Sequence, residues 1–147
     1  MSKNALVIRG GRVVTFNEVH LGDVLIQDGV IAAVGGDITT PSGATEIDAS
    51  GCWVGPGFVD LHTHLREPGK ESAENIDSGA QAAALGGYSA VVAMPNTEPA
   101  LDSAAMVGYV LERGKTAAVD VAVAGAITIG RAGAQMAPIA KLAALGV

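Results

Sequence analysis

The sequence predicts an α/β protein with two parts, a β-rich portion over residues 1–55 and three successive β–α units over residues 56–147. In the first portion, short runs of β-forming residues are separated by turn residues. In the second, apolar strand-like runs alternate three times with longer helix-like runs. Apolar residues make up 49% of the chain and aromatic residues only 3%, so the core must come from Val, Ile, Leu and Ala in tightly packed layers.

The β-rich portion contains six candidate strands. Asp28-Gly29 lies between two of them and predicts a hairpin, because a tight hairpin turn needs residues that tolerate positive φ. Gly10-Gly11 separates the first two strands, and Ser50-Gly51 precedes the last. We expect a small antiparallel sheet or sandwich. Its predicted strands are residues 5–8, 12–16, 23–27, 30–34, 45–48 and 52–54.

The three β–α units begin after Gly55-Pro56-Gly57. Asp102 is the predicted N-cap of the second helix, and glycines follow the first and third helices. The predicted strands are 58–62, 89–94 and 120–124, and the predicted helices are 73–85, 103–115 and 135–144. The alternation implies parallel βαβ units. Three parallel strands leave both sheet edges uncovered, so we expect the chain to be an inactive piece of a longer protein.

Composition excludes several classes of function. The formal net charge is -6 without a basic stripe, which argues against nucleic-acid binding. Cys52 is the only cysteine, so neither an internal disulfide nor a Cys-rich zinc site can form, and a reducing compartment is expected. No stretch approaches the roughly 18 apolar residues of a membrane span. We therefore expect a soluble, cytoplasmic protein without a membrane partner.

His62 and His64 are the candidate metal ligands. They are two residues apart at the end of a predicted strand, where alternation would put both side chains on one face. Two imidazoles could bind one divalent cation, and zinc suits them, although a catalytic zinc usually takes three protein ligands. An exposed strand end without a ligand role stays open as the alternative. His20 has no such partner, and we expect it to be an ordinary surface histidine.

Asp60 and Arg66 share the parity of the two histidines. Asp60 could accept a hydrogen bond from a ligand imidazole, or it could be satisfied by nearby backbone amides. Arg66 lies beside the histidines, where its guanidinium group suits the carboxylate of a substrate. The alternative for Arg66 is a salt bridge with a nearby acidic residue. The acidic candidates are Glu67, Glu71 and Glu74.

Asn96 follows the second strand, in the run Met94-Pro95-Asn96-Thr97-Glu98-Pro99. Because the strands should be parallel, this loop is expected at the same end of the sheet as the histidines. An amide there can donate to a carboxylate and accept from an N–H. Alternatively, Asn96 only shapes the turn.

Two sequence runs resemble a known family. Residues 55–64, Gly-Pro-Gly-Phe-Val-Asp-Leu-His-Thr-His, resemble the first barrel strand of the amidohydrolase superfamily. The extension Leu65-Arg66-Glu67-Pro68-Gly69 and the later Met94-Pro95-Asn96-Thr97 resemble dihydroorotases of the bacterial, hydantoinase-related type. The resemblance runs over essentially the whole chain. It implies an incomplete (β/α)8 TIM barrel, the first three βα units, preceded by part of a small β-sandwich domain.

The resemblance also implies roles for individual residues. His62 and His64 would ligate the more buried of two zinc ions per subunit of the full-length enzyme. His64, Arg66 and Asn96 would contact dihydroorotate, with Arg66 and Asn96 on its carboxylate. The bridging metal ligand, two further histidines and the catalytic Asp would lie beyond Val147. The implied reaction is the reversible interconversion of dihydroorotate and N-carbamoyl-aspartate in de novo pyrimidine (UMP) biosynthesis.

Two other functions are compatible with the same motifs. One is a related cyclic amidohydrolase, an allantoinase or hydantoinase, although Arg66 argues against a substrate without a carboxylate. The other is a non-catalytic dihydroorotase-like scaffold for aspartate transcarbamoylase, although such proteins tend to lose the metal histidines retained here. A homodimer and an association with aspartate transcarbamoylase are the assemblies that the resemblance implies.

Overall fold

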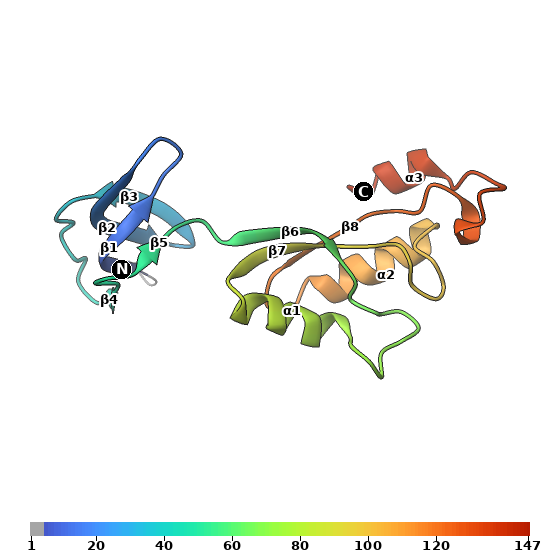
Figure 1. The fold of residues 1–147 in the computed structure, drawn as a ribbon, viewed down its shortest axis with the longest axis horizontal. Helices are drawn as coiled ribbons and strands as arrows, with labels where there is room; N and C mark the ends of the chain where they lie inside the picture. Colours follow the sequence, from blue (N-terminus) through green and yellow to red (C-terminus); the bar gives the residue numbers. More distant parts are fainter. Residues whose placement is uncertain (1–4) are drawn as a thin grey trace. The chain divides into compact units, whose positions relative to one another are not determined.

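A computed structural model describes residues 5–147 of the chain, which divide into two compact units (Figure 1). The first unit is Met1–Pro56, here called the β unit, and the second is Gly57–Val147, here called the βα unit. No helix within residues 5–147 combines the length and the apolar character needed to cross a bilayer.

The β unit is one five-stranded sheet in the order β3-β2-β1-β4, with β5 also paired to β1. The strands are β1 (Ala5–Val14), β2 (Val19–Gln27), β3 (Val30–Gly35), β4 (Thr45–Asp48) and β5 (Trp53–Val54). β1, β2 and β3 are antiparallel neighbours, but β4 and β5 both run parallel to β1. The prediction of an antiparallel sheet is therefore confirmed for β1, β2 and β3 and wrong for β4 and β5. The long connection after β3 takes the chain to the other side of β1, which allows parallel pairing.

Two glycine-containing runs behave differently in this sheet. Asp28 and Gly29, with φ of 51° and 81°, form the predicted two-residue hairpin turn between β2 and β3. Gly10 and Gly11 do not end a strand, because β1 continues through them with a shift of register against β2. The two strands predicted around these glycines are one strand with an irregularity, at which Gly10 has φ 64°.

The βα unit contains a parallel sheet in the order β6-β7-β8. Its strands are β6 (Phe58–Thr63), β7 (Tyr88–Ala93) and β8 (Asp120–Val123), and its helices are α1 (Ile76–Leu85), α2 (Ala104–Gly114) and α3 (Ile139–Ala143), with a 3-10 turn over Ile129–Arg131. α1 packs on β7 and α2 on β8, and Figure 1 shows both helices on one side of the sheet. The predicted alternation of three strands with helices is confirmed.

The buried core of the βα unit lies between the sheet and these helices. It is made largely of aliphatic side chains, as the low aromatic content predicts. Its largest fully buried side chains are Ile76, Val91, Leu101, Val107 and Val110. Burial of such side chains drives the two layers together and thereby positions the loops at the strand ends.

Both long helices begin at a side-chain cap. Asn75 caps α1 by accepting a hydrogen bond from the Ser78 N–H at 2.8 Å, which completes a capping box and places the start after the predicted residue 73. Ser103, not the predicted Asp102, caps α2. Asp102 instead accepts a hydrogen bond from the Gly130 N–H at 2.6 Å, so its carboxylate holds the turn after β8.

The third helix is shorter than predicted. It covers Ile139–Ala143, whereas the apolar pattern predicts residues 135–144. Thr128 and Met136 form an antiparallel β-bridge that keeps the start of this stretch extended. Pro138 at the N-cap also disfavours helix in the residue before it, so the helix cannot begin earlier.

Candidate functional site

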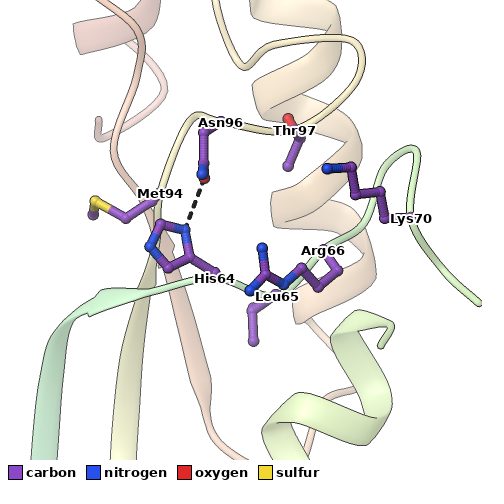
Figure 2. Close-up of a pocket in the computed structure, with 7 residues that line it drawn as sticks. All are labelled: His64, Leu65, Arg66, Lys70, Met94, Asn96 and Thr97. Carbon is purple, nitrogen blue, oxygen red and sulfur yellow. Dashed lines mark hydrogen bonds between the residues drawn. The ribbon is translucent and has the colours of Figure 1, made fainter. Parts of the chain in front are cut away.

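The candidate site lies at the carboxyl ends of β6 and β7 (Figure 2). Because these strands are parallel, the loops that follow them meet at one edge of the sheet. The loop after β6 and the loop after β7 together line a small pocket. Its lining residues are His64, Leu65, Arg66, Lys70, Met94, Asn96 and Thr97.

Backbone contacts hold the two loops together. The Met94 N–H donates to the Thr63 carbonyl at 2.9 Å, and the Glu98 N–H donates to the Pro68 carbonyl at 3.0 Å. Gly69 has φ 104°, and a Cβ atom at this position would collide with the Glu98 carbonyl oxygen. The loops therefore approach so closely at Gly69 that only glycine fits.

His62 and His64 lie side by side, as predicted. Their ring centroids are 5.2 Å apart and the rings meet edge-on at 71°. Within residues 5–147, no cluster of three or more His, Cys, Asp or Glu side chains could hold a metal ion. The donor set of this chain thus fits part of a metal site, two imidazoles to which further ligands must be added.

A hydrogen bond fixes the orientation of one of these imidazoles. His64 Nδ1 lies 2.8 Å from Asn96 Oδ1, the contact drawn as a dashed line in Figure 2. An amide oxygen only accepts, so Nδ1 of His64 donates in this pair, and in the neutral imidazole the lone pair is then on Nε2. A metal-binding histidine typically has its second ring nitrogen held by such an acceptor. The Asn96 amide nitrogen remains available to donate.

Arg66 is on the same rim of the pocket. Its side chain is exposed, and Figure 2 shows the guanidinium group directed into the space beside His64. No carboxylate among residues 5–147 lies within 4.0 Å of it, so the alternative salt bridge with Glu67, Glu71 or Glu74 is not formed. Two of these acids are engaged elsewhere, since Glu67 accepts from the Ile76 N–H and Glu71 from the Gly69 N–H, both at 2.9 Å.

Lys70 is a lining residue that the sequence motifs do not single out. Its N–H donates to the Arg66 carbonyl at 3.0 Å, which closes a turn and brings both cations to the same pocket. The pocket lining contains no carboxylate. Two cationic side chains in a lining without an acidic residue create a positive potential in the pocket, which favours an anionic ligand. The only hint in the sequence is a basic residue directly after the Pro68-Gly69 turn.

Asp60 does not follow the parity predicted for it. Asp60 pairs with Val91 and Thr63 with Ala93, so three steps along β6 match two along β7. This bulge breaks the strict alternation, and Asp60 and Thr63 line one depression beside α1. The Asp60 carboxylate accepts from the His62 backbone N–H at 2.9 Å, which is the backbone alternative rather than a bond from an imidazole.

The environment of Asp60 keeps it charged. The hydrogen bond from the His62 backbone lowers the pKa of Asp60 below that of an ordinary aspartate. The Thr63 hydroxyl lowers it further, although it falls short of full hydrogen-bond geometry and has no other partner among the described residues. Asp60 therefore stabilises the bend of the chain just before the candidate ligands.

His20 belongs to β2 of the β unit, where its Nδ1 is 3.7 Å from the Glu18 carboxylate.

Solved structures define the class of fold. The chain is similar to the L-hydantoinase (dihydropyrimidinase) from Arthrobacter aurescens, with a TM-score of 0.75 and 26% identity over 84% of this chain and 28% of that one. It is also similar to a D-hydantoinase from a Bacillus sp. AR9, with a TM-score of 0.67 and 35% identity over 80% of this chain and 26% of that one. The chain thus has a mixed α/β fold close to that of the hydantoinases.

Sequence comparison narrows this class to one family. The profile of the family described as dihydro-orotase-like matches residues 51–147, and the chain belongs to this family. It is 51% identical to a dihydroorotase of Mycobacterium tuberculosis over 90% of this chain and 30% of that protein. It is 47% identical to a dihydroorotase of Solibacter usitatus over 96% of this chain and 33% of that protein. The chain spans about a third of the length of these curated relatives.

Proposed function

We propose that these residues belong to a dihydroorotase, which interconverts dihydroorotate and N-carbamoyl-aspartate reversibly in de novo pyrimidine (UMP) biosynthesis. The observation that carries the proposal is the meeting of Arg66, Asn96 and His64 in one pocket without a carboxylate in its lining. A cyclic amide that bears a carboxylate matches this arrangement, since it offers one anionic group beside the bond to be broken. The fold expected for the whole enzyme is a (β/α)8 barrel of which β6, β7 and β8 are the first strands, with a small β-sandwich domain.

Zinc is the metal proposed for the histidine pair. His62 and His64 would hold it, with Nε2 of His64 free because Nδ1 faces Asn96. The remaining ligands, including a bridging carboxylate for a second zinc ion, would come from outside residues 5–147. When bound, zinc would supply Lewis acidity toward the ring amide and a nucleophilic water at neutral pH.

The chain itself would bind and orient the substrate. Arg66 can bind a carboxylate through two parallel N–H donors, and the free amide nitrogen of Asn96 can add a third donor. Lys70 at the rim adds attraction for the anion before it docks. Fixing the carboxylate in this way would present the neighbouring ring amide in one orientation, which is a contribution of positioning.

The substrate test uses the full-length, zinc-supplemented protein with dihydroorotate, hydantoin and allantoin as alternative substrates. We expect turnover of dihydroorotate and a loss of kcat/KM of about 30-fold or more in Arg66→Met, because truncating one partner of a charge pair typically costs about 2–5 kcal/mol. Arg131→Met is the matched control, since Arg131 lies in an exposed turn outside the pocket. Unchanged kcat/KM for dihydroorotate in Arg66→Met would overturn the proposal.

A hydantoinase-like activity is the second candidate, since the fold is similar to those of two solved hydantoinases. It predicts preferred turnover of hydantoin, whose ring carries no carboxylate, and little effect of Arg66→Met. Zinc binding without turnover of any of the three substrates would instead favour the non-catalytic scaffold. Co-purification with aspartate transcarbamoylase, compared with a homodimer alone, would identify the partner in that case.

A further inference from the structure

Glu67 is a buried carboxylate directly next to Arg66 in the chain, and the pocket itself does not use it. Only 4% of its surface is exposed. Its Oε1 accepts from the Tyr109 hydroxyl at 2.6 Å and lies 3.3 Å from the Arg113 Nε, and its Oε2 accepts from the Ile76 N–H at 2.9 Å. Both carboxylate oxygens are therefore occupied, as a buried charge requires.

These partners come from separate elements of the βα unit. Ile76 is the first residue of α1, where an unpaired N–H favours a negative charge. Tyr109 and Arg113 are four residues apart on α2, and therefore on the same face of that helix. Arg113 also reaches the Asp77 carboxylate at 3.5 Å. Glu67 thus fastens the loop after β6 to both helices at once.

The same loop holds Arg66 in an unusual backbone conformation. Arg66 has φ 63°, in the left-handed region that residues other than glycine rarely adopt. The Glu67 N–H donates to the Leu65 carbonyl at 2.8 Å, which closes a tight turn around Arg66. Leu65 is 3% exposed and belongs to the hydrophobic core. Arg66 is therefore held between two buried neighbours, and its own side chain leaves the turn toward the pocket.

We propose that Glu67, through its contacts with Tyr109 and Arg113, is a positioning residue that fixes Arg66 for the carboxylate of the substrate. The inference rests on the proposed function of Arg66. It goes beyond that function because it makes substrate affinity depend on the contact between Glu67 and α2. Neither Tyr109 nor Arg113, the two α2 residues of this contact, lines the pocket. If this contact is weakened, the turn can relax and the guanidinium group no longer meets the carboxylate in its binding geometry.

The first test replaces Tyr109 by Phe in the full-length protein. Tyr109 is 40% exposed, so the change removes one hydrogen-bond donor to Glu67 without opening a core cavity. We expect the KM for dihydroorotate to rise several-fold, up to about tenfold, with kcat changed by less than about twofold, because lost ground-state positioning raises KM. Tyr88→Phe is the matched control, since Tyr88 is 37% exposed and makes no side-chain hydrogen bond among residues 5–147; its KM should stay unchanged.

The second test is a double-mutant cycle between Glu67→Gln and Arg66→Met. If Glu67 acts through Arg66, Glu67→Gln raises KM in the wild-type background and adds no further loss of kcat/KM in the Arg66→Met background. A purely structural role predicts losses that multiply in the double variant. Should Glu67→Gln fail to fold, Tyr109→Phe takes its place in the cycle.

The outcomes separate the two proposals. Wild-type KM in Tyr109→Phe and Glu67→Gln, together with impaired Arg66→Met, overturns the positioning role alone. Losses that multiply also overturn it. Wild-type kcat/KM in Arg66→Met overturns the proposed function of Arg66 and the positioning role with it. A raised KM in both single variants, without further loss in the double variants, supports the inference.

Discussion

Within residues 5–147, each of the two units contains one buried carboxylate, and the two carboxylates have different roles. Asp23 of the β unit is 7% exposed and Glu67 of the βα unit 4% exposed. Both accept hydrogen bonds from backbone N–H groups and both contact an arginine. The donors to Asp23 are Gly10 N–H at 2.9 Å, Ile38 N–H at 3.2 Å and the Arg9 guanidinium group at 2.5 Å. All of these bonds hold strands and loops of the β unit to one another.

Two other neighbours explain the difference, Arg9, which binds Asp23, and Arg66, which precedes Glu67 in the chain but forms no salt bridge with it. Arg9 is saturated, because it binds Asp23, Glu46 and the Ile38 carbonyl together. Arg66 contacts no carboxylate within residues 5–147, and the acid beside it is turned away toward α1 and α2. An arginine whose charge is already balanced serves the fold, whereas one left unbalanced in a pocket is available to a ligand. The two arginines thus differ in their acidic partners, since Arg9 has two and Arg66 has none among residues 5–147.

The largest effects should come from replacing either Arg66 or Arg9 by methionine, one at a time, in the full-length protein. Arg66→Met should lower kcat/KM for dihydroorotate by about 30-fold or more and leave the melting temperature unchanged within about 1 °C. Arg9→Met should do the reverse, lowering the melting temperature by roughly 5 °C while kcat/KM stays within about threefold at 25 °C. Thermal unfolding and steady-state kinetics measure both. A large loss of stability in Arg66→Met would break the comparison.

Within the pocket, Asn96 and Arg66 should differ in their effect on zinc binding, since the amide oxygen of Asn96 already has a partner in His64. Asn96→Ala should weaken zinc binding by about tenfold, because losing the group that orients a ligand histidine commonly costs 10–100-fold in metal affinity. Arg66→Met should leave the zinc affinity unchanged. Competition with a chelator measures both. Unchanged zinc affinity together with a raised KM in Asn96→Ala would show that Asn96 binds the substrate and does not support metal binding through His64.

The contribution of Asp23 should depend on pH in a definite direction. The hydrogen bond from Gly10, followed by that from Arg9, lowers the pKa of Asp23 below its ordinary value. A lowered folded-state pKa means that the stabilisation is fully present above the unfolded pKa of about 3.9 and is lost as the pH falls through the folded value.

Asp23→Asn should therefore lower the melting temperature at pH 7, and its deficit should shrink once the pH falls below about 4. Melting curves from pH 7 down to well below about pH 4 measure the deficit. Asp37→Asn is the control, because Asp37 is exposed and makes no side-chain hydrogen bond among the described residues. A deficit that grows toward low pH would contradict the assignment.

The smallest effect is expected at Lys70, which attracts the anion without a fixed contact. Lys70→Ala should lower kcat/KM by about two- to fivefold and reduce its dependence on ionic strength, because exposed charges act at long range and are screened by salt. Lys141→Ala on α3 is the control, since it changes the net charge equally away from the pocket. Equal effects of the two variants would show that only the net charge matters.

Local sequence signals predicted the features that depend on neighbouring residues. Asp28-Gly29 forms its hairpin turn, and the three strands and the first two helices of the βα unit follow the apolar pattern. His62 and His64 meet because both lie at one strand end. Arg66 and Asn96 share a pocket because the ends of parallel strands share an edge.

Features set by distant partners could not be predicted in the same way. The parallel pairing of β4 with β1 depends on where a long connection leads. Asp102 fails as an N-cap because Gly130, 28 residues later, takes its carboxylate. Asp60 leaves its expected face because β6 carries a bulge against β7, and no residue type marks that bulge. Glu67 could not be recognised as an anchor because Tyr109 and Arg113 are more than 40 residues away.

The close approach of the two pocket loops at Gly69 has a consequence for how such proteins diversify. The Pro68 carbonyl binds the Glu98 N–H, and any side chain at position 69 would strike the Glu98 carbonyl. An insertion or deletion in either loop would break this register unless the other loop changed length to match. The arginine of one loop and the asparagine of the other are therefore expected to be inherited as a pair, so that related sequences exchange both loops together when their substrate changes.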